Sequence, residues 1–208
     1  MSTARGEAGT SVARARDLVF VRLRRFDVGD YHRLGESGVL SPEDRVELID
    51  GEIVEMTPIG SRHAMCVARL TSFFSGRTGS KAVVFVQSPI RLGRHSEPQP
   101  DLAILDPGDY SSHLPASRNV QLVIEVADSS LDFDRGVKVP LYARARIPEV
   151  WLVDLPGEAV EVLRHPARAG YREVTRAERA ETLSPLAFPD LAVSIDGILG
   201  PRLRRRRS

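Results

Sequence analysis

The chain has 208 residues, of which 42% are apolar and 27% are charged, so it has the size and composition of one globular domain. The net charge of +1 does not mark the whole molecule as a nucleic-acid binder, and the single cysteine, Cys66, excludes a disulfide scaffold or a thiolate metal cluster. No run approaches the ~20 apolar residues that a membrane span needs, and the N-terminus lacks the apolar core of a signal peptide. We therefore expect a cytoplasmic protein with no membrane partner.

The first half of the chain predicts helices and a hairpin after a flexible arm at residues 1–24. Asp27 is a typical helix N-cap. Asp50-Gly51 is a strong signal for a two-residue hairpin turn. Apolar residues near helical spacing then indicate a longer amphipathic helix. In order, the expected elements are a helix from Asp27 to Gly35, strands at 45–49 and 52–56, and a helix at 61–79.

The second half of the chain alternates in the manner of strands, with one helix among them. The expected elements are strands at 81–93 (bent at Pro89), 101–106 and 119–128, a helix at 131–147, a hairpin at 149–166, a strand or turn at 170–185 and a small helix near 190–200. A basic tail, residues 200–208, ends the chain. This order predicts an α/β fold with a central mixed sheet flanked by helices and an additional N-terminal β-hairpin.

Two carboxylates stand at the ends of strands that could be neighbours in the sheet. Glu125 interrupts the apolar alternation of "NVQLVIEVADSS", and Asp101 opens "DLAIL" directly after a proline. The period of two along paired strands can place both side chains on one face. Two carboxylates in contact repel unless a cation lies between them, and Mg²⁺ or Mn²⁺ is a suitable partner. The carbonyl of Val126 would be a reasonable extra ligand.

The helix that follows places Asp134, Lys138 and Tyr142 four residues apart, on one face. Pro140 falls inside this helix, which must therefore begin near residues 135–137 or bend there. Lys138 is one of only two lysines in a chain that uses arginine elsewhere. Beside a metal-bound water, a lysine can orient that water, help it to lose a proton or stabilise the developing charge.

A series of motifs resembles one family. These motifs are "VELIDGEIVEM", "SRHAMCVARL", "VVFVQSPIRL", "PDLAIL", "LVIEVADSS", "DRGVKVPLYARARIPEVWLVD" and "FPDLAVSIDGIL". The sequence resembles the Uma-two family of restriction-endonuclease-like proteins, within the PD-(D/E)XK nuclease superfamily, over residues 25–199. The resemblance implies a restriction-endonuclease-like core and a metal-dependent phosphodiesterase site.

The resemblance also assigns residues. Asp101 matches the Asp of the "PD" element, and Glu125 matches the second acidic position. The superfamily lysine two residues later is replaced by Ala127, and Lys138 on the next helix is the matching lysine. Glu47 matches the upstream acidic position that completes the metal site, directly or through water. Gln87, in "VQSPIRL", would hold the site or the substrate backbone.

Structural interpretations stay open for several of these residues. Asp101 alone could cap a turn, and Glu125 alone could pair with an arginine. His63 could contact a phosphate or a carboxylate of the site, or could cap its helix. Tyr142 is expected to pack its ring against the sheet with its hydroxyl bonded nearby. The arginine-rich tail could follow a phosphate backbone or be solvated without a role.

The leading hypothesis is a Mg²⁺- or Mn²⁺-dependent endonuclease that acts on DNA, with Asp101, Glu125, Glu47 and Lys138 as its catalytic residues. The alternative is a nucleic-acid-binding or assembly protein that keeps the nuclease fold but does little chemistry. A homodimer is expected under both hypotheses, because cutting two strands is easier with two copies.

Overall fold

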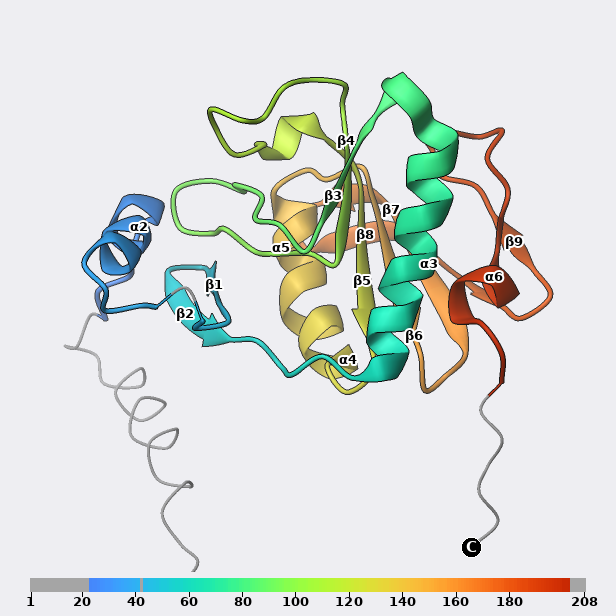
Figure 1. Ribbon diagram of the computed structural model, residues 1–208, viewed down its shortest axis with the longest axis horizontal. Coiled ribbons are helices and arrows are strands. Elements are labelled where there is room, and N and C mark those ends of the chain that lie inside the picture. Colours follow the sequence, from blue (N-terminus) through green and yellow to red (C-terminus); the bar gives the residue numbers. More distant parts are fainter. Residues whose placement is uncertain (1–22, 42, 203–208) are drawn as a thin grey trace, which may run out of the picture.

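The computed structural model describes residues 23–41 and 43–202. Its centre is a six-stranded mixed sheet in the order β3-β4-β5-β6-β7-β8, in which only β5 and β6 run parallel (Figure 1). The strands are β3 (Val83–Val86), β4 (Leu102–Leu105), β5 (Val120–Ala127), β6 (Glu149–Asp154), β7 (Ala159–Ala167) and β8 (Gly170–Glu178). The predicted mixed sheet is confirmed, and β4 pairs with β5 in it.

The alternation along β5 divides the core between the two faces of the sheet. Leu122, Ile124 and Val126 pack with the long helix α3 (Ser61–Thr78) on one face. Val123 and Ala127 pack with α5 (Val139–Arg144) on the other. Because successive side chains of a strand point to opposite faces, Glu125 must point toward the α5 face. Burial of both faces explains why a strand this apolar lies in the middle of the sheet.

The N-terminal part forms a small unit beside the sheet. Helix α2 (Val28–Glu36) begins with a capping box, in which Asp27 and Asp30 each accept a hydrogen bond from the other's backbone. The predicted hairpin follows as β1 (Val46–Ile49) and β2 (Glu52–Glu55), paired antiparallel. It is attached to the rest of the molecule by the bond from the Glu97 amide to the Leu48 carbonyl.

The conformation of the hairpin turn indicates that a substitution at Gly51 should lower the free energy of unfolding. Gly51 has φ = 81°, and a Cβ there would lie 2.5 Å from the Cβ of Arg25. We expect Gly51→Ala to lower the free energy of unfolding by about 1–3 kcal/mol, because the turn requires a left-handed residue and leaves no space for a side chain. Urea unfolding of the two proteins would measure this. Gly35→Ala is the control, since a Cβ at Gly35 meets nothing within 4 Å. An equal loss in both variants would contradict the argument.

The helical segment after β5 begins before residues 135–137 and accommodates Pro140 by means of a π-helical turn. It begins as α4 (Leu131–Phe133), passes through a π-helical turn (Asp134–Lys138) and continues as α5. The Val139 amide donates to the Asp134 carbonyl, five residues back, and Pro140 then falls in the first turn of α5, where a missing N–H costs little.

Other predicted bounds need correction. The strand expected at 81–93 ends at Val86, because Gln87 takes a left-handed conformation (φ = 44°). It begins at Val83, after a short 3₁₀ turn (Gly79–Lys81). The region 170–185 contains β8 and also β9 (Thr182–Leu183), which pairs with β10 (Val193–Ser194) before α6 (Ile195–Leu199). A 3₁₀ turn (Ser117–Asn119) leads into β5.

The predicted flexible arm and basic tail lie outside the described residues, apart from residues 23–24 and 200–202. Within the described ranges, every helix is too short or too polar to cross a bilayer.

Candidate active site

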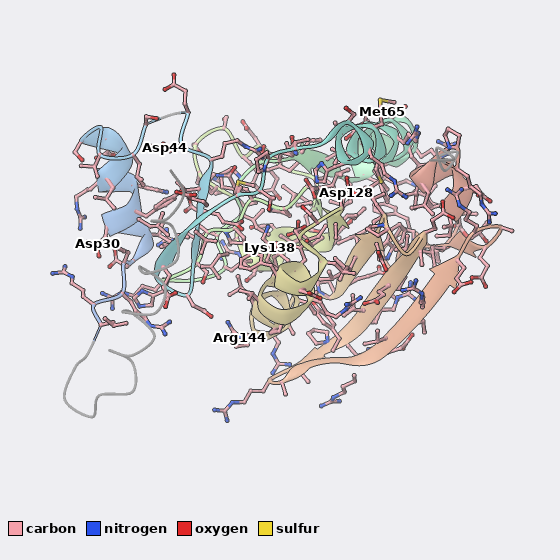
Figure 2. All side chains as sticks on the ribbon, turned by 90° about the horizontal axis from the view of Figure 1, so that it is seen from below. Asp30, Asp44, Met65, Asp128, Lys138 and Arg144 are labelled. Atoms are coloured by element: carbon pink, nitrogen blue, oxygen red, sulfur yellow. The ribbon has the colours of Figure 1, made fainter. Side chains whose placement is uncertain are left out.

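A cavity of about 470 Å³ lies where the C-terminal end of β5 meets the hairpin, the start of α3 and the start of α4. Figure 1 shows these elements meeting at the lower side of the molecule, and Figure 2, seen from below, shows Lys138 and Asp128 there. Most of the ionisable side chains that line the cavity are acidic. The acidic ones are Glu47, Glu55, Asp101, Glu125, Asp128 and Asp134, and the basic ones are Arg45, His63 and Lys138. Of the residues predicted for the site, all but Gln87 and Tyr142 line this cavity.

Lys138 lies between two buried carboxylates at the floor of the cavity. Its Nζ is 3.2 Å from Glu47 Oε2, on the hairpin, and 3.2 Å from Glu125 Oε1, on the central strand. The side chains of both glutamates are 3% exposed and that of Lys138 is 6% exposed. The π-helical turn therefore brings to β5 the lysine that is absent at Ala127. The alternative in which Glu125 pairs with an arginine is not what the structure shows.

Burial and neighbouring charges change the pKa values of Glu125 and Lys138 at this floor. Burial raises the pKa of the Glu125 carboxyl to about 8, and the attraction of Lys138 only partly offsets it. Burial by itself lowers the pKa of Lys138, but the charges of Glu125 and Glu47 outweigh it and hold this pKa above its usual value. One ammonium thus serves two carboxyl groups. Lys138 stays protonated at neutral pH, which favours a role in charge stabilisation over one as a proton acceptor.

Two side chains of the helical segment support this floor. The hydroxyl of Tyr142 donates to Glu125 Oε1 at 2.5 Å, and its ring packs in the core beneath the sheet, as the sequence predicts. Asp134 is buried and accepts a 2.6 Å hydrogen bond from Ser130 Oγ. Burial raises the pKa of Asp134 above its usual value, although the bond from Ser130 opposes this.

Asp101 stands at the same end of the sheet but is held by other donors. Leu102 pairs with Ile124 in the antiparallel ladder, so the preceding Asp101 comes beside Glu125. Its Oδ2 accepts hydrogen bonds from the Val126 amide (2.8 Å) and from His63 Nε2 (3.0 Å). Its carboxylate is therefore oriented by these two groups and does not bond directly to Glu125.

The other two predicted supporting residues contact Asp101. Gln87 Nε2 donates to Asp101 Oδ1 at 3.3 Å, from the left-handed position where β3 ends. The hydrogen bond to Asp101 raises the pKa of His63 above its usual value, against the effect of burial. Of the alternatives left open for His63, the contact with a site carboxylate is present. Among the described residues, no side chain makes a capping hydrogen bond at the start of α3.

Sequence reasoning missed several residues of the cavity. The Gln99 amide donates to Glu47 Oε2 at 3.1 Å and so fixes the hairpin carboxylate. Arg45, Asp128 and Phe133 line the walls. For Arg45, its place two residues before Glu47 in the predicted strand was a usable signal. The others come from loops or from a helix start, where no periodic pattern indicates which way a side chain points.

The carboxyl groups that line the cavity are ligands of the kind that a hard divalent cation binds. Oxygen ligands are those that Mg²⁺ and Mn²⁺ prefer, and the carboxyl groups of Glu47, Asp101 and Glu125 line the same cavity. Within residues 23–41 and 43–202, however, no group of three or more His, Cys, Asp or Glu side chains is already arranged to hold a metal. The donor set therefore fits the cation, and binding would require these side chains to move.

Comparisons with known proteins agree on the fold. The profile of the Uma2 family, described as "Putative restriction endonuclease", matches residues 28–196. No curated protein matches the sequence significantly. A crystal structure of a putative nuclease belonging to DUF820, from Anabaena variabilis ATCC 29413, superposes with a TM-score of 0.67 at 17% identity, covering 84% of this chain and 97% of that one. That likeness shows a shared fold with the nuclease-like protein, and the family match covers most of the described residues. The chain belongs to the Uma2 family.

Proposed function

We propose that this protein is a Mg²⁺- or Mn²⁺-dependent endonuclease that hydrolyses phosphodiester bonds in DNA. The observation that carries the proposal is the cavity floor, where Lys138 lies between Glu47 and Glu125 and Asp101 stands beside them. A nuclease site of the PD-(D/E)XK type needs carboxylates that hold a cation and a lysine near the attacked phosphate. Membership in a family described as "Putative restriction endonuclease" supports the same conclusion.

Each residue has a distinct role in the proposed reaction. Asp101 and Glu125 would hold the cation, with Glu47 and the Val126 carbonyl completing its surroundings. The bound cation would supply Lewis-acid polarisation of the phosphate and a more acidic water. The Lys138 ammonium would stabilise the negative charge that develops on the phosphate oxygens. His63 and Gln87 orient Asp101 through hydrogen bonds, and Tyr142 orients Glu125.

The direct test is a cleavage assay on supercoiled and linear DNA with Mg²⁺ or Mn²⁺. We expect strand breaks that require the cation and stop in excess EDTA. Cleavage that survives EDTA would rule out this mechanism. Arg172→Ala, on the far strand β8, is a suitable control variant that should cut like wild type, because it changes a surface charge away from the cavity.

One observation favours the alternative of a binding protein with little catalysis. The acidic side chains of the described residues are not already assembled around a cation position. Calorimetric titration with Mn²⁺ separates the two functions. The nuclease hypothesis expects binding to wild type that is lost in Asp101→Asn. DNA binding without any metal binding would favour the alternative.

Two further expectations remain predictions. A homodimer would be detected by sedimentation of the full chain, with and without DNA. A cytoplasmic location would be detected by fractionation of cells that express the protein.

A further inference from the structure

The reacting groups lie deep below the surface. The side chains of Glu47, Glu125 and Lys138 are between 3% and 6% exposed at the cavity floor. Residues of strand β2 and of the loop at residues 56–60 line one side of the cavity. This loop runs from the hairpin to α3 (Figure 1). The phosphates of a stiff double helix lie on a broad cylinder and cannot enter such a cavity without distortion of the DNA. A phosphodiester must reach this floor on a flexible strand.

Apolar side chains also line the cavity. They are Val54 on the hairpin, Met56 and Ile59 on the loop, and Phe133 at the end of α4. Phe133 is half-buried there, whereas Leu131 and Tyr142 of the same helical segment pack into the core. A cavity that combines an aromatic side chain and other apolar side chains with charged groups matches a nucleotide whose base is unstacked.

The volume of the cavity and the position of Arg45 agree with a nucleotide as the bound group. A volume of about 470 Å³ is in the range of sites that enclose one small ligand. Arg45 is exposed and lines the same cavity, with its Nη1 3.4 Å from the Thr57 carbonyl. A guanidinium at that position can contact a phosphate next to the one at the floor.

We propose that the cavity binds one unpaired nucleotide of a single-stranded segment, with the base against Phe133 and Met56 and the phosphodiester directed at Lys138. This inference rests on the proposed nuclease function and names its substrate class: single-stranded DNA, or DNA with unpaired ends or loops. Paired DNA can place a nucleotide in the cavity only after that nucleotide has left the stack, which costs free energy, so a blunt duplex should bind the protein surface without entering the cavity.

The test measures binding separately from cleavage. Glu125→Gln in Mg²⁺ would be titrated into a labelled single-stranded DNA oligonucleotide, the same sequence as a blunt duplex, and the matching RNA strand, with fluorescence anisotropy as the readout. We expect the single strand to bind about tenfold or more tightly than the duplex. Phe133→Ala, added to Glu125→Gln, should weaken single-strand binding by roughly 5- to 100-fold, the range of base–aromatic stacking, and should leave duplex binding unchanged.

Phe133→Trp distinguishes loss of base stacking from loss of the fold as the cause of the Phe133→Ala effect. A larger aromatic ring can still stack, so this variant should keep the single-strand preference. Phe73→Ala is the matched control, since Phe73 is also a half-buried phenylalanine but lies on α3 against Phe74 and Arg77. Equal or tighter binding of the duplex would overturn the inference. So would a Phe133→Ala effect that is equal on both DNA forms. Tighter binding of the RNA strand would support the unpaired-nucleotide site and change the substrate from DNA to RNA.

Cleavage by the wild-type chain distinguishes this inference from the proposed function. Metal-dependent cutting of duplex and single strand at equal rates would leave the nuclease function standing and overturn the substrate class. A single-strand preference in binding, with no metal-dependent cutting of any form, would support the nucleotide site and overturn the nuclease function.

Discussion

Glu125→Gln should abolish metal-dependent cleavage and at the same time make the folded chain more stable. The amide keeps an oxygen that can accept from Tyr142 and Lys138, but it removes a charge that the proposed cation needs. We expect cleavage to fall by at least about a hundredfold, as for loss of a group that stabilises the transition state. Because burial disfavours the charged carboxyl, the free energy of unfolding should rise by roughly 1 kcal/mol or more at pH 9.

The raised pKa of Glu125 also determines how the free energy of unfolding changes with pH. The pKa of Glu125 is raised from 4.5 to about 8 on folding, so the folded chain binds the proton more tightly than the unfolded chain does. The stabilisation from this group is complete below pH 4.5 and is lost as the pH rises through 8. Urea unfolding at several pH values should show a decline in wild type between these limits that is smaller in Glu125→Gln.

Glu149→Gln is the matched control for the stability measurement. Glu149 is fully buried on β6 but accepts hydrogen bonds from Arg164, Trp151 and the Leu186 amide. Loss of its charge should destabilise the fold and leave cleavage by the folded chain unchanged. If Glu125→Gln were also destabilising at pH 9, the electrostatic description of the cavity floor would be wrong.

Lys138→Met should cause the largest loss of stability among the cavity variants. It removes the cation between Glu47 and Glu125 and leaves two buried carboxyl groups side by side, which typically costs about 3–5 kcal/mol. The loss should be greater at pH 8 than at pH 5, because a carboxyl without its cation can take up a proton at the lower pH. Urea unfolding at both pH values measures the difference.

The double variant Glu125→Gln with Lys138→Met tests whether the two groups interact. Its loss should be smaller than the sum of the single effects, because the amide no longer needs the ammonium. Strict additivity would show that Lys138 stabilises the fold through other contacts. Lys81→Met is the control for loss of a lysine, since Lys81 is exposed in the turn before β3.

Local patterns in the sequence predicted most of the architecture. The Asp50-Gly51 turn, the Asp27 N-cap and the alternation of β5 each depend on residues close together in the chain, and each is present in the structure. The end of β3 was misplaced because Gln87 takes a left-handed conformation without being a glycine, and Pro89 was interpreted as a bend within the strand. Tertiary contacts that hold Gln87 against Asp101 decide that conformation.

The candidate site was predictable in its members and less so in its contacts. The sequence indicated that Lys138 would approach Glu125, and the structure shows the contact. The resemblance to a family was needed to connect Glu47, because nothing in the hairpin sequence indicates where the hairpin docks. The pairing of Asp101 with His63 depends on how α3 lies on the sheet, which periodicity does not specify.

The position of Glu47 on the hairpin has a consequence for biosynthesis. The hairpin is made early, but its carboxylate meets Lys138 only after the central strand and the π-helical turn have been translated and have folded. Contacts between distant segments form late, because the chain must close a long loop to make them. A ribosome-bound fragment that ends before Lys138 therefore lacks the assembled floor, and a nascent chain has no complete site until Lys138 has been translated.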